Sequence, residues 1–343
     1  MLPLHANFDL LGHNTLGIAA KAQWLAQIRH PDDLVALANQ PELADLPRRV
    51  LGGGSNLVLA GDLPGLTLKV EIPGRRILGD DEHYVYVAIG GGESWHGTVE
   101  WTLQQGLSGL ENLSLIPGTV GAAPVQNIGA YGVELKDVLH ELTAYHLTDG
   151  SARRFSLVDC RFAYRDSVFK QDQAGQWLIG EVVLRLPKRA ALHTEYGELA
   201  RELAALNKPA TAIDVATAVC KIRRSKLPDP AQIGNAGSFF KNPLVSQAQY
   251  SALLATFPAL VGYLQPSGDY KLAAGWLIEQ AGWKGRQLGP VGMYARQALV
   301  LVNHGGASGA EVMALAAAVQ AAVQEKFGVM LEPEPVIWGL ASQ

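Results

Sequence analysis

The residues with the clearest capacity for chemistry are backbone groups in two glycine-rich segments. The first is Gly-Gly-Gly-Ser-Asn at 52–56, and the second is LSLIPGTVGAAPVQNIGAYG at 113–132. Glycine-rich backbone can turn several N–H groups into one concavity, and such a nest binds phosphate oxygens without a cation. Segment 52–56 alone is more typical of an ordinary β-turn. Two such uncharged segments in one chain favour a dinucleotide whose pyrophosphate is held by backbone amides.

The two commonest nucleotide fingerprints are absent. A Rossmann G-x-G-x-x-G needs a third glycine, and position 57 is Leu. No glycine run ends in Gly-Lys-Ser or Gly-Lys-Thr, so the P-loop of the triphosphate-binding proteins is missing as well. A dinucleotide would therefore be bound by another kind of fold.

Isolated side chains that could move protons or hold charge lie far apart in the sequence. Arg165 lies between Tyr164 and Asp166, where a surface ion pair is the ordinary interpretation. Ser238 lies in GNAGSFFKNP at 234–243 without the G-x-S-x-G pattern of a hydrolase nucleophile. Glu332 and Glu334 would share one strand face by the two-residue period, as solvated carboxylates often do.

Metal and disulfide chemistry find no support in the sequence. The nine histidines include no H-x-H or HExxH arrangement, so we expect no metal. Cys160 and Cys220 are too few for a disulfide scaffold and indicate a reducing compartment with a packing role.

Short strands and tight turns must position the first glycine-rich segment. Apolar runs bounded by glycine predict strands, and the spacing of Trp95, Val99 and Leu103 predicts a helix that stops at Gly106. Segment 113–132 is expected to be a loop in special backbone conformations, neither helix nor strand. The predicted strands lie at 50–51, 57–59, 84–89, 142–147 with a hairpin turn at 148–150, and 180–186.

The second half of the chain predicts more helix. Segment 198–226 has helical spacing and is broken by Pro228 and Pro230, from which a separate α+β unit extends to about residue 330. That unit should hold an apolar helix over 271–281 and a last helix with a Ser308–Glu311 capping box. The buried stripe of that last helix should be Val312, Leu315, Val319 and Val323, and Gly328 should end it. Segment 329–338 then predicts a strand that is interrupted by Pro333 and Pro335.

Composition limits the class of protein. With 343 residues and about 150 per domain, two or three domains are expected. Hydrophobic residues make up 48% and charged residues 17%, which excludes a disordered chain, and a net charge of −4 argues against a nucleic-acid partner. No secretory signal and no membrane span of roughly 20 apolar residues is visible. We expect a soluble, cytoplasmic protein, a monomer without nucleic-acid or membrane partners.

Taken together, these segments resemble one family, the UDP-N-acetylenolpyruvoylglucosamine reductases (UDP-N-acetylmuramate dehydrogenases), of the first structural type. GSFFKNP and PVQNIGAYG are highly specific strings, and the matches run in order over almost the whole chain. They are HNTLG at 13–17, GGGSN at 52–56, LIPGTVGAAPVQNIGAYG at 115–132, YRDSVFK at 164–170, TEYGEL at 194–199, RRSKLPDP at 223–230, GNAGSFFKNP at 234–243, KLAAGWLIEQ at 271–280, RQALVLVN at 296–303 and LEPE at 331–334.

The resemblance implies a fold and a reaction. The fold is an α+β FAD-binding fold of the vanillyl-alcohol-oxidase (PCMH) type, with two α+β subdomains and a C-terminal α+β substrate-binding domain. FAD would be bound non-covalently, and NADPH would reduce it before the enolpyruvyl group of UDP-N-acetylglucosamine-enolpyruvate is reduced to UDP-N-acetylmuramate. That step belongs to the synthesis of peptidoglycan precursors, and hence to the cell wall, cell shape and division.

The resemblance also assigns residues to roles. Arg165, Ser238 and Glu334 would be catalytic, and Tyr196, Lys226, Asn242, Lys284 and Gln297 would contact substrate. The residues assigned to FAD are Gly52, Gly53, Gly54, Ser55, Asn56, Leu57, Pro117, Gly118, Gly121, Ala122, Ala123, Gln126, Asn127, Ile128, Gly129, Ala130, Tyr131, Ile179 and Arg223.

The reaction accounts for these residue types. Hydride addition to an enol ether leaves charge on the neighbouring carbon, which delocalises into the adjoining carboxylate. Arg165 and Glu334 would stabilise that carboxylate, and Ser238 would donate the proton. Glu334 can help only when protonated, so we predict that burial raises its pKa.

Two positions depart from the family pattern. Ala122 and Ala123 stand where some relatives have two serines, so backbone amides would have to hold the pyrophosphate there. Pro335 follows Glu334 and restricts it to extended geometry. Val336 and Ile337 cannot replace the arginine that several relatives carry downstream.

The expected organisation is three domains. Residues 1–72 form FAD-binding subdomain 1, with a C-terminal strand in 331–343 returning to it; residues 73–222 form subdomain 2; residues 223–330 bind substrate. Two alternatives remain open. One is another flavin oxidoreductase of this fold with a covalent flavin, for which His96 is the nearby candidate, and the other is a non-catalytic nucleotide-sugar-binding protein.

Overall fold

The computed structural model describes residues 2–340, and the chain divides into two compact units. The first unit comprises residues 2–8, 22–54 and 64–225, and the second comprises residues 9–21, 55–63 and 226–340. The chain therefore passes from one unit to the other several times, once between Gly54 and Ser55 inside the first glycine-rich segment.

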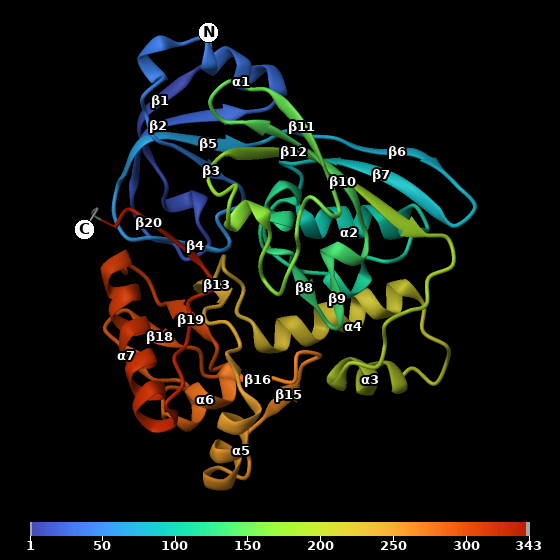
Figure 1. The fold of residues 1–343 in the computed structure, drawn as a ribbon, viewed down its shortest axis with the longest axis vertical. Helices are drawn as coiled ribbons and strands as arrows, with labels where there is room; N and C mark the ends of the chain where they lie inside the picture. Colours follow the sequence, from blue (N-terminus) through green and yellow to red (C-terminus); the bar gives the residue numbers. More distant parts are fainter. Residues whose placement is uncertain (1, 341–343) are drawn as a thin grey trace. The chain divides into compact units, whose positions relative to one another are not determined.

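The first unit contains two larger sheets and one two-stranded sheet among its described residues (Figure 1). One sheet has the order β1-β2-β5-β3, with β3 parallel to β5. The other is antiparallel and has the order β11-β10-β12-β7-β6. The strands are β1 Leu4–Asp9, β2 Lys21–Ile28, β3 Arg48–Leu51, β5 Leu63–Val70, β6 Arg75–Asp80, β7 Tyr84–Gly90, β10 Leu139–His146, β11 Ala152–Ser156 and β12 Trp177–Pro187, with a short pair β8 Gly129–Ala130 and β9 Val133–Glu134.

Four α-helices lie in or end the first unit. They are α1 Pro31–Ala38, α2 Trp95–Gln104, α3 Gly197–Ala204 and α4 Ala212–Lys226. The predicted helix from Trp95, its stop before Gly106 and the hairpin over 148–150 are confirmed, and the helical segment after residue 198 is two helices. Short 3-10 helices lie at Leu11–His13 in the second unit and at Pro41–Leu43, Glu111–Leu113, Val120–Gln126, Leu135–Asp137 and Val168–Lys170 in the first.

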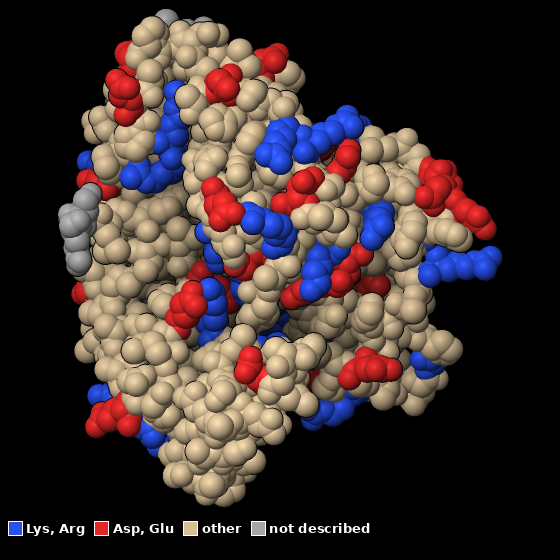
Figure 2. All heavy atoms as spheres, in the orientation of Figure 1, with Lys and Arg blue, Asp and Glu red and all other residues tan. Residues whose placement is uncertain are grey.

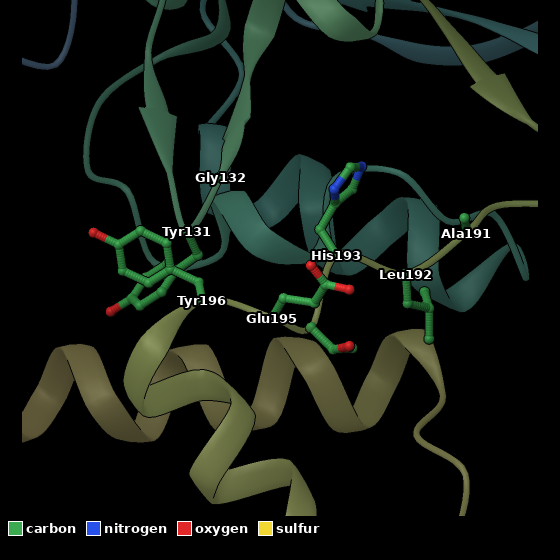
Figure 3. A pocket seen from close by; sticks show the side chains of 8 residues that line it. Tyr131, Gly132, Ala191, Leu192, His193, Glu195 and Tyr196 are labelled. Carbon is green, nitrogen blue, oxygen red and sulfur yellow. The ribbon is translucent and has the colours of Figure 1, made fainter. Parts of the chain in front are cut away.

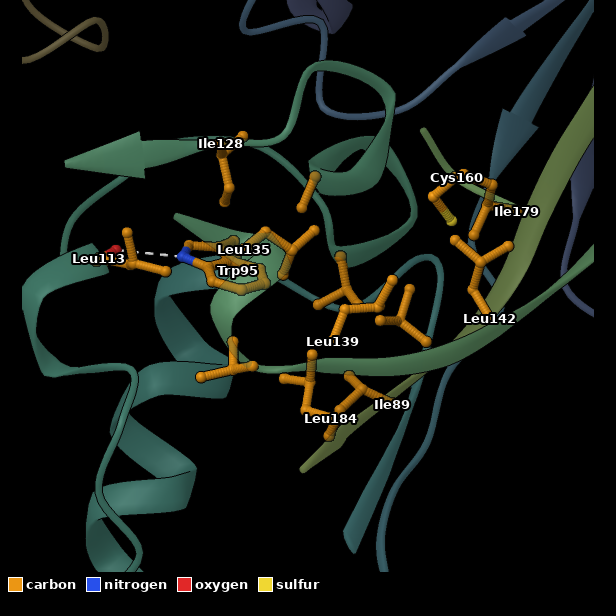
Figure 4. Close-up of a cluster of buried hydrophobic side chains, with 14 of the residues drawn as sticks. Ile89, Trp95, Leu113, Ile128, Leu135, Leu139, Leu142, Cys160, Ile179 and Leu184 are labelled. Carbon is orange, nitrogen blue, oxygen red and sulfur yellow. Dashed lines mark hydrogen bonds between the residues drawn. The ribbon is translucent and has the colours of Figure 1, made fainter. Parts of the chain in front are cut away.

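The core beneath the antiparallel sheet packs α2 and segment 110–139 against one face of that sheet (Figure 4). Trp95 is fully buried at the start of α2, and its indole N–H donates to the carbonyl oxygen of Leu113 at 3.0 Å. Burial of an indole is favourable only when that N–H finds an acceptor. The pair therefore fixes the beginning of the second glycine-rich segment against α2.

That segment is only partly the irregular loop the sequence predicted. Positive φ angles at Leu115, Gly118, Asn127 and Tyr131 confirm the special backbone conformations. The expectation of neither helix nor strand was wrong, because Val120–Gln126 forms a 3-10 helix and Gly129–Ala130 a short strand. The small residues of segment 120–126 fit the tight winding of a 3-10 helix. Pro124 lies inside it, and a proline in the interior of an α-helix would be unfavourable.

The second unit holds a four-stranded and a three-stranded sheet. The first has the order β13-β19-β18-β17, and the second β14-β16-β15. A third, two-stranded sheet pairs β20 in parallel with β4. The strands are β4 Leu57–Leu59, β13 Gly234–Ser238, β14 Leu244–Val245, β15 Gly262–Leu264, β16 Tyr270–Leu272, β17 Gln287–Leu288, β18 Val291–Met293, β19 Val300–Asn303 and β20 Val336–Trp338.

The helices of the second unit are α5 Gln247–Thr256, α6 Ala274–Gln280 and α7 Gly309–Phe327. The Ser308–Glu311 capping box of α7 and its Gly328 terminator are confirmed, and the predicted stripe is buried. Gly309 is required at the first turn, since a Cβ there would lie 1.9 Å from the carbonyl oxygen of Leu59 in β4. The helix thus packs directly onto the strand that follows the first glycine-rich segment.

Two predicted elements of this unit were wrong in extent. The helix expected over 271–281 begins only at Ala274, because Tyr270–Leu272 pairs with strands on both sides. The strand expected over 329–338 is confined to Val336–Trp338, because the two prolines cannot donate ladder hydrogen bonds. Residues 341–343 of the expected returning segment lie outside the described residues.

Candidate functional site

The two glycine-rich segments meet in the first unit at backbone distance. A Cβ at Gly53 would lie 2.8 Å from the Cα of Gly118, and one at Gly52 would lie 2.8 Å from the Oγ1 of Thr119. Only glycine permits this approach. The two glycine-rich segments therefore lie in direct backbone contact.

The amides that follow Gly118 are already used inside the protein. Gly121 donates its N–H to the carbonyl oxygen of Gly91 at 2.8 Å, and Ala122 donates to that of Thr119 at 3.1 Å. The expectation that backbone amides at Ala122 substitute for the missing serine hydroxyls therefore finds no support at that N–H. Instead, the hydroxyl of Thr119 is buried and has no hydrogen-bond partner among the described residues. The sequence did not single out Thr119, although it directly follows Gly118.

Arg223 of α4 is a second group whose hydrogen-bonding capacity is not used. Its Nε is buried without a hydrogen-bond partner among the described residues, and burial lowers the pKa of its guanidinium. Tyr131 and Cys220 are near enough to raise that pKa and Arg165 to lower it further. A partly buried cation near a second cation is stabilised when an anion binds to it.

These observations test whether the first unit suits FAD. A dinucleotide needs close backbone approach at its pyrophosphate, hydrogen-bond donors and a cation. The glycine contacts, the Thr119 hydroxyl and the Arg223 guanidinium supply these three features. The donor set fits FAD.

Other residues predicted to contact FAD have different surroundings. Asn127 is fully buried; its amide donates to the Oε2 of Glu134 at 3.0 Å and to the carbonyl oxygen of Ala163 at 3.1 Å, and its Oδ1 accepts from Lys136. Its side chain thus serves the loop itself. Leu57, Ala123, Ile128 and Ile179 are buried apolar residues.

Arg165 lies in the first unit on a strained backbone. Its φ of 54° is left-handed, a region that costs a residue with a side chain free energy. The guanidinium donates to the carbonyl oxygen of Gly129 at 2.7 Å and lies 5.4 Å from the Tyr164 ring centroid. The Nζ of Lys170 donates to the Arg165 carbonyl oxygen at 3.1 Å. Because such strain persists where the surroundings enforce it, the guanidinium is held at the second glycine-rich segment.

Tyr196 borders a cavity of about 480 Å³ in the first unit (Figure 3). Its ring packs edge-on against Tyr131 at a centroid distance of 5.6 Å, at the end of the cavity opposite Ala191 and Leu192. Tyr196 is 59% exposed, so its ring is accessible to a ligand. The cavity is lined by Tyr131, Gly132 and residues 191–196.

Asn112 fastens the two sides of this cavity, and the sequence did not reveal it. It is 1% exposed, and its Nδ2 donates to the carbonyl oxygens of Tyr131 at 3.0 Å and His193 at 2.8 Å. Neither acceptor is near Asn112 in sequence, so no local pattern could have shown the pairing. A buried amide that uses both of its N–H groups fixes its partners firmly.

Ser238 and Glu334 lie on adjacent segments of the second unit. Ser238 ends β13, opposite Val300 and after a register shift, and Gly237 before it has a φ of 72°. Glu334 donates its N–H to the carbonyl oxygen of Phe239 at 2.9 Å. The structure thus brings together two of the three residues predicted to be catalytic, while Arg165 belongs to the first unit.

Asn56 holds the other side of Glu334. Its Nδ2 donates to the carbonyl oxygen of Glu334 at 3.4 Å, and its own carbonyl accepts from the N–H of Val336 at 3.0 Å. Pro335, between them, is buried and has no N–H to satisfy. The unusual proline therefore costs no hydrogen bond in this arrangement.

The two glutamates of the LEPEP motif have different surroundings. Glu332 is 69% exposed at its side chain and forms an ion pair with Lys241, whereas Glu334 is half-buried. The continuous strand begins only at Val336, and Pro333, between the two glutamates, forms an isolated antiparallel bridge with Phe240. This difference leaves Glu334 as the better candidate for chemistry.

The other predicted substrate contacts in the second unit also have internal partners. The Oδ1 of Asn242 accepts from the first N–H of α6, that of Ala274, at 3.0 Å. Lys284 forms an ion pair with Glu279 at 2.8 Å, and Gln297 accepts from Leu299 at 3.4 Å. Lys226 ends α4.

Charge is dispersed over the face of the molecule in Figure 2. Basic and acidic side chains are interspersed on the face in Figure 2, without an extended field of one sign. Residues 2–340 contain no group of three or more His, Cys, Asp or Glu that could hold a metal ion. No helix within the same range is long and apolar enough to cross a bilayer.

Comparisons with known proteins agree with this site. Residues 22–156 match the model of an FAD-binding domain, and residues 229–338 match the C-terminal domain of UDP-N-acetylenolpyruvoylglucosamine reductase. The reductase of Thermus caldophilus has the same fold, with a TM-score of 0.68 at 24% identity over 99% of each chain.

Two curated relatives decide the family. The chain is 54% identical to the UDP-N-acetylenolpyruvoylglucosamine reductase of Burkholderia multivorans over 98% of this chain and 96% of that protein. It is 53% identical to that of Bdellovibrio bacteriovorus over 98% of this chain and the whole of that protein. With its FAD-binding domain, the chain is an oxidoreductase that belongs to the UDP-N-acetylenolpyruvoylglucosamine reductase family.

Proposed function

We propose that this protein uses NADPH and non-covalent FAD to reduce the enolpyruvyl group of UDP-N-acetylglucosamine-enolpyruvate to UDP-N-acetylmuramate. The names of its relatives support the substrate, and the FAD-binding domain supports the cofactor. NADPH enters from the family resemblance and supplies the reducing equivalents.

The proposed role of the chain's own residues follows from the charge that the reaction develops. FAD held by the residues assigned below would supply the hydride for the reduction of the enol ether at its terminal carbon. Ser238 then donates its hydroxyl proton to the neighbouring carbon. Arg165 and a protonated Glu334 stabilise the adjoining carboxylate while it carries the excess charge.

The observation that carries this proposal is the hydrogen bond from the Glu334 N–H to the Phe239 carbonyl oxygen. It joins the segment of the proposed acid to the segment of the proposed proton donor. The Asn56 contacts fix the same segment from its other side. Ser238 can therefore approach one carbon while Glu334 approaches the carboxylate beside it, without movement of either segment.

We assign the FAD contacts to the two glycine-rich segments and to Arg223. Thr119 is added because its buried hydroxyl has no partner in the described part of the chain, and the Asn127 side chain is left to its internal bonds. We propose that the sugar nucleotide is contacted by Tyr196, Lys226, Asn242, Lys284 and Gln297. The two lysines would form ion pairs with its phosphates.

The remaining expectations are also proposals. We propose domain boundaries near residues 72, 222 and 330, with the C-terminal strand completing the first domain. We further propose that the protein acts as a cytoplasmic monomer.

Half-reaction spectroscopy tests this function. The purified protein should be yellow, and denaturation should release all of its flavin. Anaerobic NADPH should bleach the flavin absorbance, and UDP-N-acetylglucosamine-enolpyruvate should then restore it. A colourless protein that cannot be reconstituted with FAD, or a reduced flavin that this substrate does not reoxidise, contradicts the proposal.

A further inference from the structure

Two consecutive side chains of α2 bind the backbone of the second glycine-rich segment. The indole of Trp95 donates to the carbonyl oxygen of Leu113 at 3.0 Å, and the Nδ1 of His96 accepts from the N–H of Leu115 at 3.0 Å. Between these two points lies Ser114, which is fully buried. The segment is thus fastened shortly before Pro117 and Gly118.

The peptide that His96 holds is in an unfavourable conformation. Leu115 has a φ of 59°, a left-handed geometry that costs a leucine free energy because its Cβ crowds the backbone. Such a residue persists only where its surroundings fix it. The accepting nitrogen of His96 is the hydrogen-bond partner of that residue's N–H.

The hydrogen bond requires one protonation state of His96. Nδ1 can accept from a backbone N–H only when it carries no proton, so the ring must be neutral with its hydrogen on Nε2. That hydrogen faces Glu100, whose Oε1 lies 3.5 Å from Nε2. Protonation of the ring would place a hydrogen on Nδ1, so that this N–H and the N–H of Leu115 would repel each other and the hydrogen bond would be lost.

The charges around His96 act in both directions. Burial, the largest effect, lowers its pKa below the ordinary 6.5; Glu100 on the same helix raises it, and Arg224 and Arg223 of α4 lower it. The folded protein therefore favours the neutral ring. The stability from this preference is complete above pH 6.5 and is lost as the pH falls through 6.5 toward the folded pKa.

We propose that His96 is a positioning residue of the FAD site: its neutral imidazole holds the Leu115 N–H and so fixes the turn that presents Pro117 and Gly118 to the cofactor. This inference rests on the proposed FAD contacts of segment 117–131. It also gives His96 a role other than the covalent flavin attachment for which the sequence left it a candidate.

The test compares three variants in flavin-free protein. His96→Leu removes the acceptor, whereas His96→Asn places an amide oxygen near the position of Nδ1 and cannot be protonated at ordinary pH. His83→Leu is the matched control, since His83 is exposed on the first unit. FAD dissociation constants are measured by flavin fluorescence between pH 5.5 and 8, and hydrogen exchange of segment 113–119 is measured without flavin.

At pH 8 we expect His96→Leu to bind FAD about tenfold or more weakly and to exchange faster in segment 113–119. His96→Asn and His83→Leu should stay near the wild type. The wild type should lose affinity relative to His96→Asn only as the pH falls below 6.5 and through the lowered pKa of the folded His96.

Two results overturn the inference: equal FAD binding by His96→Leu and the wild type, or parallel pH profiles for the wild type and His96→Asn. Failure of the wild type to bind FAD at all contradicts the proposed function itself, so the two failures are distinguishable.

Discussion

The main-chain N–H of Glu334 donates to the carbonyl oxygen of Phe239, the residue after Ser238, at 2.9 Å. A single peptide contact thus couples the two segments that carry the proposed proton donor and acid. Because it uses main-chain atoms, the side chain of either residue can be replaced without loss of this contact.

Replacement of Glu334 tests the role of its carboxyl. Glu334→Ala should keep FAD and lower kcat about 10²–10³-fold, the usual effect of losing one donor to developing charge. Glu334→Gln, which retains a donor, should lose less. The free energy of unfolding should change by no more than about 0.5 kcal/mol. Steady-state kinetics and thermal unfolding check these values.

Glu332 provides the matched control for that experiment. Its exposed ion pair with Lys241 is of a kind that contributes about 0–1 kcal/mol. Glu332→Ala should therefore leave kcat and KM unchanged. An equal loss of activity in both alanine variants would argue against a specific role for Glu334.

Replacement of Arg223 should have opposite effects on the empty and the flavin-bound protein. Arg223→Leu removes a partly buried cation whose buried Nε has no partner among the described residues, so flavin-free protein should melt at a higher temperature. FAD should bind about 10–100-fold more weakly, since a charged hydrogen bond is lost. Arg201→Leu, at an exposed position of α3, is the control. Unchanged FAD affinity in Arg223→Leu would contradict the assignment.

Asn112 should matter for substrate capture through Tyr196. Asn112→Ala leaves the carbonyl oxygens of Tyr131 and His193 without their donor, at a cost of about 1–3 kcal/mol in unfolding free energy. KM for the sugar nucleotide should rise more than kcat falls, because loosening the Tyr196 segment removes binding energy. Tyr196→Ala, at an exposed position, should raise KM without the loss of stability. A normal KM in both variants would remove this cavity from the substrate site.

The start of α4 should contribute acid-sensitive stability. Bonds from the N–H and hydroxyl of Thr211, with Lys208 nearby, lower the pKa of Asp214 from 3.8 to about 2. Because the folded pKa is depressed, the stabilisation is present above pH 3.8 and is lost as the pH falls from 3.8 toward 2. Asp214→Asn should therefore be less stable than the wild type at pH 7 and equally stable near pH 2. A constant difference in unfolding free energy across that range would be inconsistent with this titration.

Sequence patterns predicted the elements whose signals are local. The Ser308–Glu311 box, the Gly328 terminator and the Trp95 helix all depend on residues within a few positions of one another. The start of α6 was missed because Tyr270–Leu272 is a strand only by virtue of partners elsewhere in the chain.

The same distinction holds for the site. The composition of the glycine-rich segments was enough to predict them, and Ser238 and Glu334 were predicted from the family resemblance. The contact between their segments, from Glu334 to Phe239, depends on pairing between distant parts of the chain, which no spacing reveals. Leu115 in a left-handed conformation, and the His96 nitrogen that holds it, contradict local propensity and were invisible for that reason.

The most direct test of the account is the reoxidation of reduced flavin in Ser238→Ala. NADPH should reduce the flavin of this variant at the wild-type rate, because the hydroxyl takes no part in that half. Reoxidation by the enolpyruvyl substrate, followed anaerobically by stopped flow, should slow about 10²–10⁴-fold, the contribution of a positioned proton donor. Ser251→Ala, on exposed helix α5, should match the wild type in both halves. Reoxidation of Ser238→Ala at the wild-type rate would contradict the central claim.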